Sequence, residues 1–173
     1  MSDREQPTGR VLRAITAPPQ VRFGPRLFHL LSRLFVALYG RFPTFGHLPS
    51  SVGVLQRGES VLVVDRSDGL GWGFPGGMAW PWEREEQTLR REFREETGLE
   101  VTAARFLFRY RDRHFIPSRI TVFAVEEASG PLVGSWEGEP RWVTLSELQT
   151  RVFACHAEIL HRLGQSPDRP QTP

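Results

Sequence analysis

The segment over residues 85–98 constrains the fold of this chain more than any other part of the sequence. It reads EEQTLRREFREETG and predicts a helix over 85–97. The first turn is rich in acidic residues, which suits the positive end of a helix dipole, and Gly98 can take the left-handed conformation that ends a helix. Leu89 and Phe93 are four residues apart and form an apolar stripe. We therefore expect this helix to pack against a β-sheet.

Three glutamates of the same helix occupy positions i, i+3 and i+4, so their carboxylates project from one face. They are Glu92, Glu95 and Glu96. Anions at this spacing repel one another, and hard oxygen ligands suit Mg²⁺, which binds carboxylates together with phosphate oxygens and water. Arg91 can reach back to one carboxylate and fix its orientation. The alternative is the solvated charged face of an ordinary amphipathic helix.

A longer pattern around the helix favours the metal-binding interpretation. Residues 77–99 read GMAWPWEREEQTLRREFREETGL and match G-x5-E-x7-R-E-U-x-E-E-x-G-U, where U is apolar. The fixed positions are filled by Gly77, Glu83, Arg91, Glu92, Glu95, Glu96 and Gly98. A random window matches this pattern with a probability on the order of 10⁻⁹ or less. The chain thus resembles the Nudix hydrolase family (MutT-like), because residues 77–99 match the complete Nudix box.

This resemblance implies a fold, an activity and a set of site residues. The fold is an α/β Nudix fold with a mixed β-sheet sandwiched between α-helices, to which an N-terminal helix is added here. The activity is metal-dependent hydrolysis of a pyrophosphate bond in a nucleoside diphosphate linked to another moiety (nucleotide sugar, ADP-ribose or NTP type), which releases a nucleoside monophosphate. The implied ligands of Mg²⁺ or Mn²⁺ are the carbonyl of Gly76 and the carboxylates of Glu92, Glu95 and Glu96. The same glutamates and Arg91 are the implied catalytic residues.

Residues outside the box complete the expected site. The stretch E137-G138-E139 resembles a loop that supplies a further metal-binding or base glutamate in some relatives, and we favour Glu137 over Glu139; a solvated acidic loop is the alternative. Arg109 and Arg119 are candidates for substrate binding, because a guanidinium matches phosphate oxygens in a fork. Solvated strand ends are the alternative for these arginines.

Two tryptophans depart from the usual pattern in the loop between Gly77 and Glu83 of the Nudix box, which we call the box loop. Relatives commonly carry an acidic residue and a glycine where this chain has Trp80 and Trp82. An exposed tryptophan pair can stack on a base or an apolar group, which makes Trp80 a candidate substrate-binding residue. Core packing or a plug that stabilises the loop is the alternative.

The order of patterns along the chain predicts one catalytic domain with flanking segments. We expect a flexible segment over 1–24, an apolar amphipathic helix over 25–40, the hydrolase domain over 51–164 and a flexible tail over 165–173. Strands are expected at 52–54, 61–64, 101–111, 120–126 and 141–143. A turn is expected at 57–59 and a loop with exposed backbone at 72–77. Two helices should follow the last strand: one that opens with a capping box at 144–147, and a terminal helix over 153–163 closed by Gly164.

Composition limits the partners and the compartment. One cysteine, Cys155, rules out an intramolecular disulfide and is compatible with a reducing compartment, so a cytoplasmic protein is expected. The resemblance implies a small-molecule nucleotide diphosphate substrate, and we expect no binding of nucleic acid because no long basic run with interleaved aromatic residues appears. Residues 25–40 leave three alternatives open: a helix packed on the domain or in a homodimer interface, a helix on a membrane surface with peripheral membrane association, or an organelle-targeting segment.

Two other function classes remain at this stage. One is a Nudix-fold module that senses a nucleotide without hydrolysing it, although an intact set of box glutamates argues against a pure binder. The other is a membrane-surface hydrolase of a lipid-linked diphosphate, suggested by the apolar run at 27–39.

Overall fold

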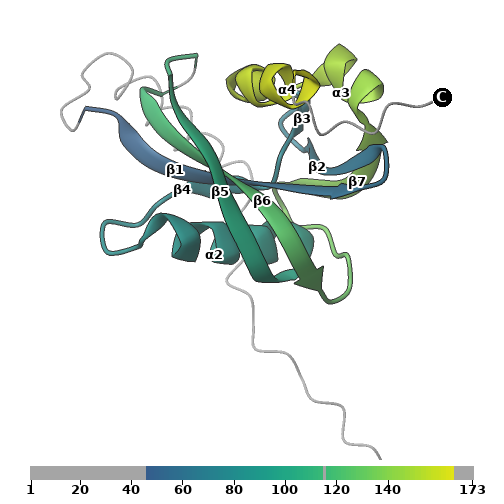
Figure 1. The fold of residues 1–173 in the computed structure, drawn as a ribbon, viewed down its shortest axis with the longest axis horizontal. Coiled ribbons are helices and arrows are strands. Elements are labelled where there is room, and N and C mark those ends of the chain that lie inside the picture. Colours follow the sequence, from purple (N-terminus) through teal and green to yellow (C-terminus); the bar gives the residue numbers. More distant parts are fainter. Residues whose placement is uncertain (1–45, 115, 166–173) are drawn as a thin grey trace, which may run out of the picture.

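The structure is a computed structural model that describes residues 46–114 and 116–165 (Figure 1). The predicted segments at 1–24 and 25–40, and the tail after residue 165, lie outside the described residues. Within the described ranges, no helix has both the length and the apolar character needed to cross a membrane.

The described residues form a mixed sheet with helices on both faces, as the resemblance implied (Figure 1). The path through the sheet runs β3-β2-β1-β6-β5, with β4 added on β1 and β7 on β2. Strands β1 and β6 are parallel, whereas their other neighbours pair antiparallel. The strands are β1 (Leu48–Arg57), β2 (Ser60–Arg66), β3 (Trp72–Gly73), β4 (Gly76–Met78), β5 (Glu100–Asp112), β6 (Ser118–Ser129) and β7 (Gly138–Thr144).

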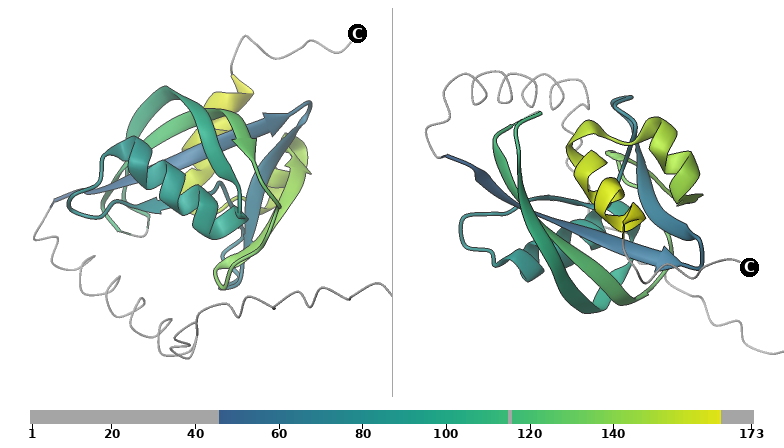
Figure 2. Two further views of the ribbon diagram at one scale, coloured as in Figure 1. Left: turned by 90° about the horizontal axis from the view of Figure 1, so that it is seen from below. Right: turned by 45° about the horizontal axis from the view of Figure 1, so that its top comes forward.

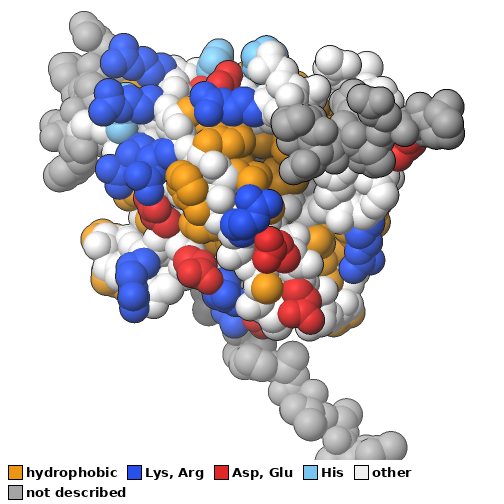
Figure 3. All heavy atoms as spheres, in the orientation of Figure 1, with side chains coloured by type: hydrophobic (Ala, Val, Ile, Leu, Met, Phe, Trp, Pro, Cys, Tyr) orange, Lys and Arg blue, Asp and Glu red, His pale blue; other side chains and the backbone are white. Residues whose placement is uncertain are grey.

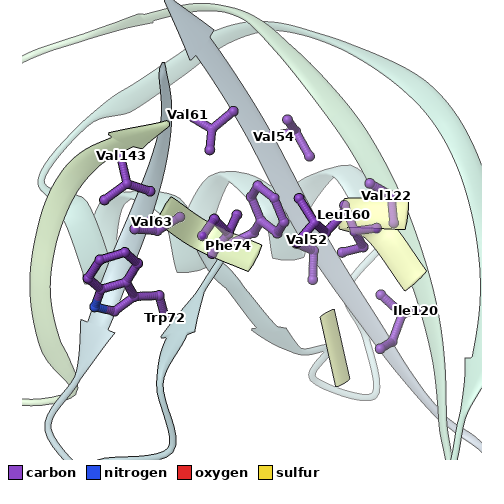
Figure 4. Close-up of a cluster of buried hydrophobic side chains, with 12 residues drawn as sticks. Val52, Val54, Val61, Val63, Trp72, Phe74, Ile120, Val122, Val143 and Leu160 are labelled. Carbon is purple, nitrogen blue, oxygen red and sulfur yellow. The ribbon is translucent and has the colours of Figure 1, made fainter. Parts of the chain in front are cut away.

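The helices divide between the two faces of the sheet. Helix α2 (Glu85–Thr97) crosses one face, and α3 (Leu145–Arg151) and α4 (Ala157–Gly164) cover the other (Figures 1 and 2). A core cluster lies on each side. Leu89 and Phe93 of α2 are fully buried in one cluster, which confirms the predicted apolar stripe. The other cluster gathers around Phe74 and includes Val52 and Leu160 (Figure 4).

Helix α2 begins and ends where the sequence predicted. The amide of Arg84 donates to Gln87 Oε1 at 2.9 Å at the N-terminus, and Gly98 at the other end has φ of 76° with its N–H bonded to Arg94 O. Gly53 on β1 allows the helix to approach the sheet, because a Cβ there would lie 2.8 Å from Leu89 Cδ1. The helix therefore sits directly on the backbone of β1.

Two predicted segments differ from the structure. Residues 72–77 were expected to form a loop, but their ends form β3 and β4, because Gly73 pairs with Val64 of β2 and Gly76 with Val52 of β1. The terminal helix predicted over 153–163 is interrupted: a 3-10 turn, η1 (Ala154–His156), precedes α4, and Gly164 is the last helical residue. His156 causes this break, because its Nδ1 accepts the Phe74 N–H at 3.0 Å and its backbone leaves the helical conformation.

The remaining predictions for local structure are confirmed. Strands β1 and β2 meet in a hairpin at Gly58, whose φ is 57°. Thr144 and Glu147 form the capping box at the start of α3, in which Thr144 N–H donates to Glu147 Oε2 at 2.8 Å. The short strand predicted at 141–143 is part of the longer β7, which pairs along β2.

Gly98→Ala and Gly58→Ala form a matched pair of fold tests. Both glycines have positive φ, so alanine costs about 1–2 kcal/mol of backbone strain at either position. A Cβ at position 98 would also lie 2.6 Å from Pro131 O, whereas one at position 58 meets nothing within 4 Å. We expect Gly98→Ala to lower the free energy of unfolding more than Gly58→Ala, as measured by urea denaturation. Equal losses of unfolding free energy in the two variants would show that the close approach of position 98 to Pro131 O does not contribute to stability at the end of α2.

Candidate metal centre

Two glycines of β4 hold the backbone against the glutamates of α2. The Gly76 N–H donates to Glu96 Oε2 at 2.8 Å. A Cβ at Gly77 would lie 2.6 Å from Glu92 Oε1, and a Cβ at Gly76 would lie 2.2 Å from Ser51 O. A side chain at position 76 would clash with the backbone of β1, and one at position 77 would displace the Glu92 carboxylate from the strand. The Gly76–Gly77 backbone and both carboxylates therefore border one site.

Glu137 is brought to the same site by a tight hairpin. Ser135 and Gly138 exchange backbone hydrogen bonds at 3.0 and 3.3 Å, so residues 136 and 137 form the tip of the turn. The end of β2 anchors this tip, since Ser67 N–H donates to Glu137 O at 2.8 Å. Glu139, one residue into β7, is exposed and its carboxylate lies against Gly134 instead.

A cleft of about 670 Å³ runs over these groups. It contains all three box glutamates of α2 together with Glu137, Arg91 and Trp80, which the sequence had singled out. Its lining consists of Leu48, Arg66, Asp68, Gly76, Gly77, Met78, Ala79, Trp80, Arg91, Glu92, Glu95, Glu96, Trp136 and Glu137.

Burial raises the pKa of three of these carboxyls. The pKa of Glu92 rises to about 7 through burial, opposed by Arg91 and reinforced by the negative charge of Glu137. Glu96 is only 6% exposed, and burial raises its pKa well above the usual range despite the hydrogen bond from Gly76. Burial also raises the pKa of Glu137. Several carboxylates are thus held in a partly dry site without matching positive charge.

A divalent cation fits this donor set. Clustered carboxylates and a nearby backbone carbonyl are the oxygen ligands that Mg²⁺ prefers, and the charge of the ion offsets their mutual repulsion. Within residues 46–114 and 116–165, no three acidic, histidine or cysteine side chains already converge as a ligand set. Glu92 is bonded to Arg91 at 2.7 Å, so cation binding requires Glu92 to exchange part of that contact.

Arg91 connects the box loop to the helix, and it reaches the carboxylates as the sequence suggested. Its guanidinium contacts Glu83 at 2.7 and 2.9 Å, Glu92 at 2.7 Å and Glu95 at 3.2 Å. The bonds from Arg91, together with those from the Trp80 amide and the Thr88 hydroxyl, lower the pKa of Glu83 to about 2. Arg91 therefore orients both the loop and the acidic face of α2.

Trp80 lies at the cleft and does not pack in the core. Its side chain is 54% exposed and stacks on Trp82, with ring centroids 5.8 Å apart and planes 6° from parallel.

The structure does not bring Arg109 and Arg119 to the cleft. Arg109 of β5 donates to both carboxylate oxygens of Glu85 at 2.5 and 2.7 Å, and to Thr121 at 2.9 Å, so its fork is already engaged beside the start of α2. Arg119 is exposed on β6, next to Arg111 of β5. On the face of the molecule seen in Figure 3, arginine side chains stand among acidic ones around a central apolar area.

Three charged or aromatic residues of the cleft were not selected from the sequence. Arg66, the last residue of β2, forms an ion pair with Asp68 at 2.5 Å, and Trp136 precedes Glu137. No motif surrounds Arg66 or Asp68, so their place depends on how β2 enters the sheet. Trp136 could have been found from its neighbour Glu137, which the sequence did select.

A second cavity of about 220 Å³ adjoins the cleft. The two spaces share Arg66, Gly76, Gly77, Met78 and Glu96, so the glycine backbone borders both. The second cavity is otherwise mainly apolar and aromatic, and its lining includes Val52, Phe74, Ile116, Ile120, Phe153, Cys155 and His156.

Two side chains of this second cavity are uncharged at neutral pH. Burial lowers the pKa of His156 to about 4, so the ring is neutral and can accept the Phe74 N–H. Burial raises the pKa of Cys155 to about 12, which leaves a protonated thiol. No site role was expected for His156, whose place beside the cavity follows from the break between η1 and α4.

Comparisons with known proteins place the fold among proteins of one family. A family model described as the NUDIX domain matches residues 47–163. A curated protein named "Putative 8-oxo-dGTP diphosphatase YtkD" from Bacillus subtilis (strain 168) is 33% identical over 67 residues, which are 39% of this chain and 42% of that protein. The chain therefore spans about two fifths of the length of this curated relative.

Solved structures share the fold. The solution structure of the E. coli ORF135 protein has a TM-score of 0.62 at 22% identity, covering 76% of this chain and 99% of that one. The crystal structure of the MutT NUDIX hydrolase from Burkholderia pseudomallei has a TM-score of 0.60 at 21% identity, covering 67% of this chain and 97% of that one.

Glu83→Gln tests the contact between the box loop and Arg91. Because charge-assisted hydrogen bonds are lost, we expect the free energy of unfolding at neutral pH to fall by about 2 kcal/mol. The folded-state pKa of Glu83, about 2, lies below the ordinary value of 4.5. The contribution of the ionised Glu83 carboxylate to the free energy of unfolding is therefore present above pH 4.5 and is lost as the pH falls toward 2.

Urea unfolding at neutral pH and at about pH 3 measures this effect. The difference in the free energy of unfolding between wild type and Glu83→Gln should be smaller at the lower pH. Glu59→Gln, at an exposed position, serves as a control that should have little effect at either pH. A difference that stays constant across this range would contradict the Arg91–Glu83 interaction as the source of the stability.

Proposed function

The chain belongs to the NUDIX domain family of pyrophosphohydrolases, and from this premise we propose that it uses Mg²⁺ to hydrolyse a nucleoside diphosphate linked to a further moiety X. Members of the family hydrolyse nucleoside diphosphates linked to another moiety and generally need a divalent metal ion. The choice of Mg²⁺, with Mn²⁺ as the alternative, rests on the all-oxygen donor set.

One observation carries the proposal: Glu92 and Glu96 lie against the Gly76–Gly77 backbone and Glu137 lines the same cleft, with the charges of the three carboxylates only partly compensated. Desolvating several carboxylates costs stability, and Arg91 offsets part of this cost. Such an arrangement is expected where a cation and a phosphate group occupy the site during function.

The Gly76 carbonyl and the carboxylates of Glu92, Glu95 and Glu96 would hold the metal. When bound, the cation supplies charge neutralisation at the pyrophosphate and lowers the pKa of a coordinated water. Arg91 holds Glu92 in position from the side of the box loop. The rigid contact between β4 and α2 keeps these groups in a fixed relation, which positions the phosphates for in-line attack.

We assign the general base to Glu137, because it belongs to the same cleft and comes from a different loop than the metal-holding face of α2. Its carboxylate takes a proton from the attacking water while the water oxygen bonds to one phosphorus. The bridging P–O bond breaks, so that one product is a nucleoside monophosphate and the other is phosphorylated X.

The two adjoining spaces suggest how substrate is divided between them. The apolar cavity beside Phe74 and His156 suits the nucleoside, and the diphosphate then lies along the Gly76–Gly77 backbone. Arg66 lines both spaces and would contact the diphosphate by exchanging part of its ion pair with Asp68, whereas Arg109 and Arg119, which were expected in this role, stand elsewhere. The group X extends into the cleft beside Trp80.

A second candidate substrate comes from the similarity to the protein named a putative 8-oxo-dGTP diphosphatase. An oxidised nucleoside triphosphate would use the same carboxylates, with pyrophosphate in the place of phosphorylated X. A nucleotide-sensing module is not favoured, because a pure binder has no need of every box glutamate. Homodimer or membrane contact through residues 25–40 stays a hypothesis, since that segment lies outside the described residues.

Glu96→Gln and Glu137→Gln test the proposal, with Glu139→Gln as the matched control. Removal of a metal-holding or base carboxylate should lower kcat by about 10²- to 10⁴-fold with the fold intact. Glu139 lies two residues from Glu137 but outside the cleft, so Glu139→Gln should retain turnover. The measurement is nucleoside monophosphate release from a panel of nucleoside diphosphate derivatives with Mg²⁺.

Circular dichroism and thermal melting confirm the fold of each variant. Wild-type rates in a folded Glu96→Gln protein would contradict the assigned metal site, and wild-type rates in Glu137→Gln would move the base to another residue. Loss of activity in Glu139→Gln would show that the two acidic positions were assigned in the wrong order.

A further inference from the structure

Two large indole side chains lie at the acidic cleft with about half their surface in solvent. Trp80 is 54% exposed and Trp136 is 53% exposed, and both belong to the lining of the 670 Å³ cleft. They come from separate parts of the chain, one from the loop between β4 and α2 and the other from the hairpin before β7. Exposed aromatic surface beside a polar site commonly marks a binding surface, because it gains free energy when a ligand covers it.

The indole of Trp80 is held in place before any ligand arrives. Trp82 stacks on it with nearly parallel planes, and the backbone N–H of Trp80 donates to Glu83 Oε2 at 3.0 Å. Glu83 is bonded in turn to Arg91, which also contacts Glu92. This chain of contacts fixes the backbone of residue 80, and the Arg91 guanidinium lies 5.8 Å from the centre of the Trp80 ring, so the indole is held beside the metal-holding carboxylates. A ring stacked on it therefore loses little free energy to ordering of the protein.

Trp136 is fixed relative to the site in a comparable way. Its carbonyl accepts from the Ser67 hydroxyl at 3.0 Å, and its neighbour Glu137 is bonded through its own carbonyl to Ser67 N–H. The residue that we assign as general base and the second indole thus share one hairpin tip. A group stacked on Trp136 would therefore lie at the same hairpin tip as the assigned general base.

The charges of the cleft disfavour a free terminal phosphate. The lining includes five carboxylate side chains and two guanidinium side chains: Asp68, Glu92, Glu95, Glu96 and Glu137 against Arg66 and Arg91. Each of these arginines is already in an ion pair, Arg66 with Asp68 and Arg91 with Glu83 and Glu92. A terminal phosphate would find acidic groups and indoles beyond the metal-holding face, whereas an uncharged or cationic planar ring would find favourable partners.

We infer that X, the group on the second phosphate, carries a planar aromatic ring that stacks on Trp80 and Trp136, so that the preferred substrates have a ring at both ends of the diphosphate. This inference rests on the proposed function and specifies its substrate class. It places a nucleobase-like ring in the cleft, opposite the nucleoside in the cavity beside Phe74.

Two substrates that differ by one ring provide the test. Diadenosine 5′,5′-diphosphate is ADP-ribose with a second adenine on its distal ribose, and hydrolysis of either compound releases AMP. Base stacking on an aromatic side chain is worth several-fold to about 150-fold in affinity. With Mg²⁺ present, we expect kcat/KM for diadenosine diphosphate to exceed that for ADP-ribose by about 10-fold or more.

The variants locate this preference. Trp80→Ala and Trp136→Ala should each reduce the ratio of the two kcat/KM values by about 5-fold or more, and Trp80→Phe, which keeps a ring, should restore most of it. Phe106→Ala is the matched control, because Phe106 is 52% exposed on β5 but is not part of the cleft lining, and it should leave the ratio unchanged.

The outcomes separate the inference from the proposed function. If wild type hydrolyses both compounds at equal kcat/KM, or if Trp80→Ala and Trp136→Ala both keep the wild-type ratio, the ring subsite is wrong while the hydrolase stands. If neither of the two compounds nor any other nucleoside diphosphate derivative in the panel is hydrolysed, the proposed function fails. Calorimetric binding of the same pair then decides the inference: tighter binding of diadenosine diphosphate that depends on Trp80 supports it, and equal binding overturns it.

Discussion

The contact between helix α2 and glycine backbone is the constraint on which the rest of this structure depends. At one end of the contact Gly53 of β1 lies under Leu89 and Phe93, and at the other the Gly76–Gly77 backbone lies against Glu92 and Glu96. The first contact contributes apolar burial, and the second places carboxylates in a partly dry site. The free energy gained by burying the apolar face of the helix therefore offsets the unfavourable free energy of desolvating its glutamates.

The box loop transmits this geometry to the surface. Arg91 bonds Glu83 and Glu92 at once, so the loop that carries Trp80 and Trp82 moves with the helix that carries the carboxylates. A separate anchor at Ser67 brings Glu137 in from the hairpin before β7. Chemistry and substrate contact are thus supplied by different segments that meet at one cleft, an arrangement in which the loops can vary while the scaffold is retained.

Local patterns predicted the parts of the fold that are governed by local physics. The α2 boundaries follow from acidic residues at its start and from Gly98, and the α3 capping box follows from Thr144 and Glu147. Long-range pairing was not accessible in the same way. Nothing near Gly73 or Gly76 reveals that they pair with β2 and β1, and the break at His156 depends on a hydrogen bond to Phe74, 82 residues away. The sequence selected the residues of the acidic face correctly as neighbours, but it could not show that Arg109 is engaged by Glu85 or that Arg66 lines the cleft.

The most direct test of the metal centre is a calorimetric titration of Mg²⁺ into wild type and Glu96→Gln across a range of pH. Metal ligands must be deprotonated, and the pKa of Glu92 is about 7 in the metal-free protein. We expect saturable binding to wild type that weakens as the pH falls through 7 and that is lost or greatly weakened in Glu96→Gln. Equal Mg²⁺ affinity in a folded Glu96→Gln protein, with no dependence on pH, would show that the buried glutamates of α2 do not hold the cation.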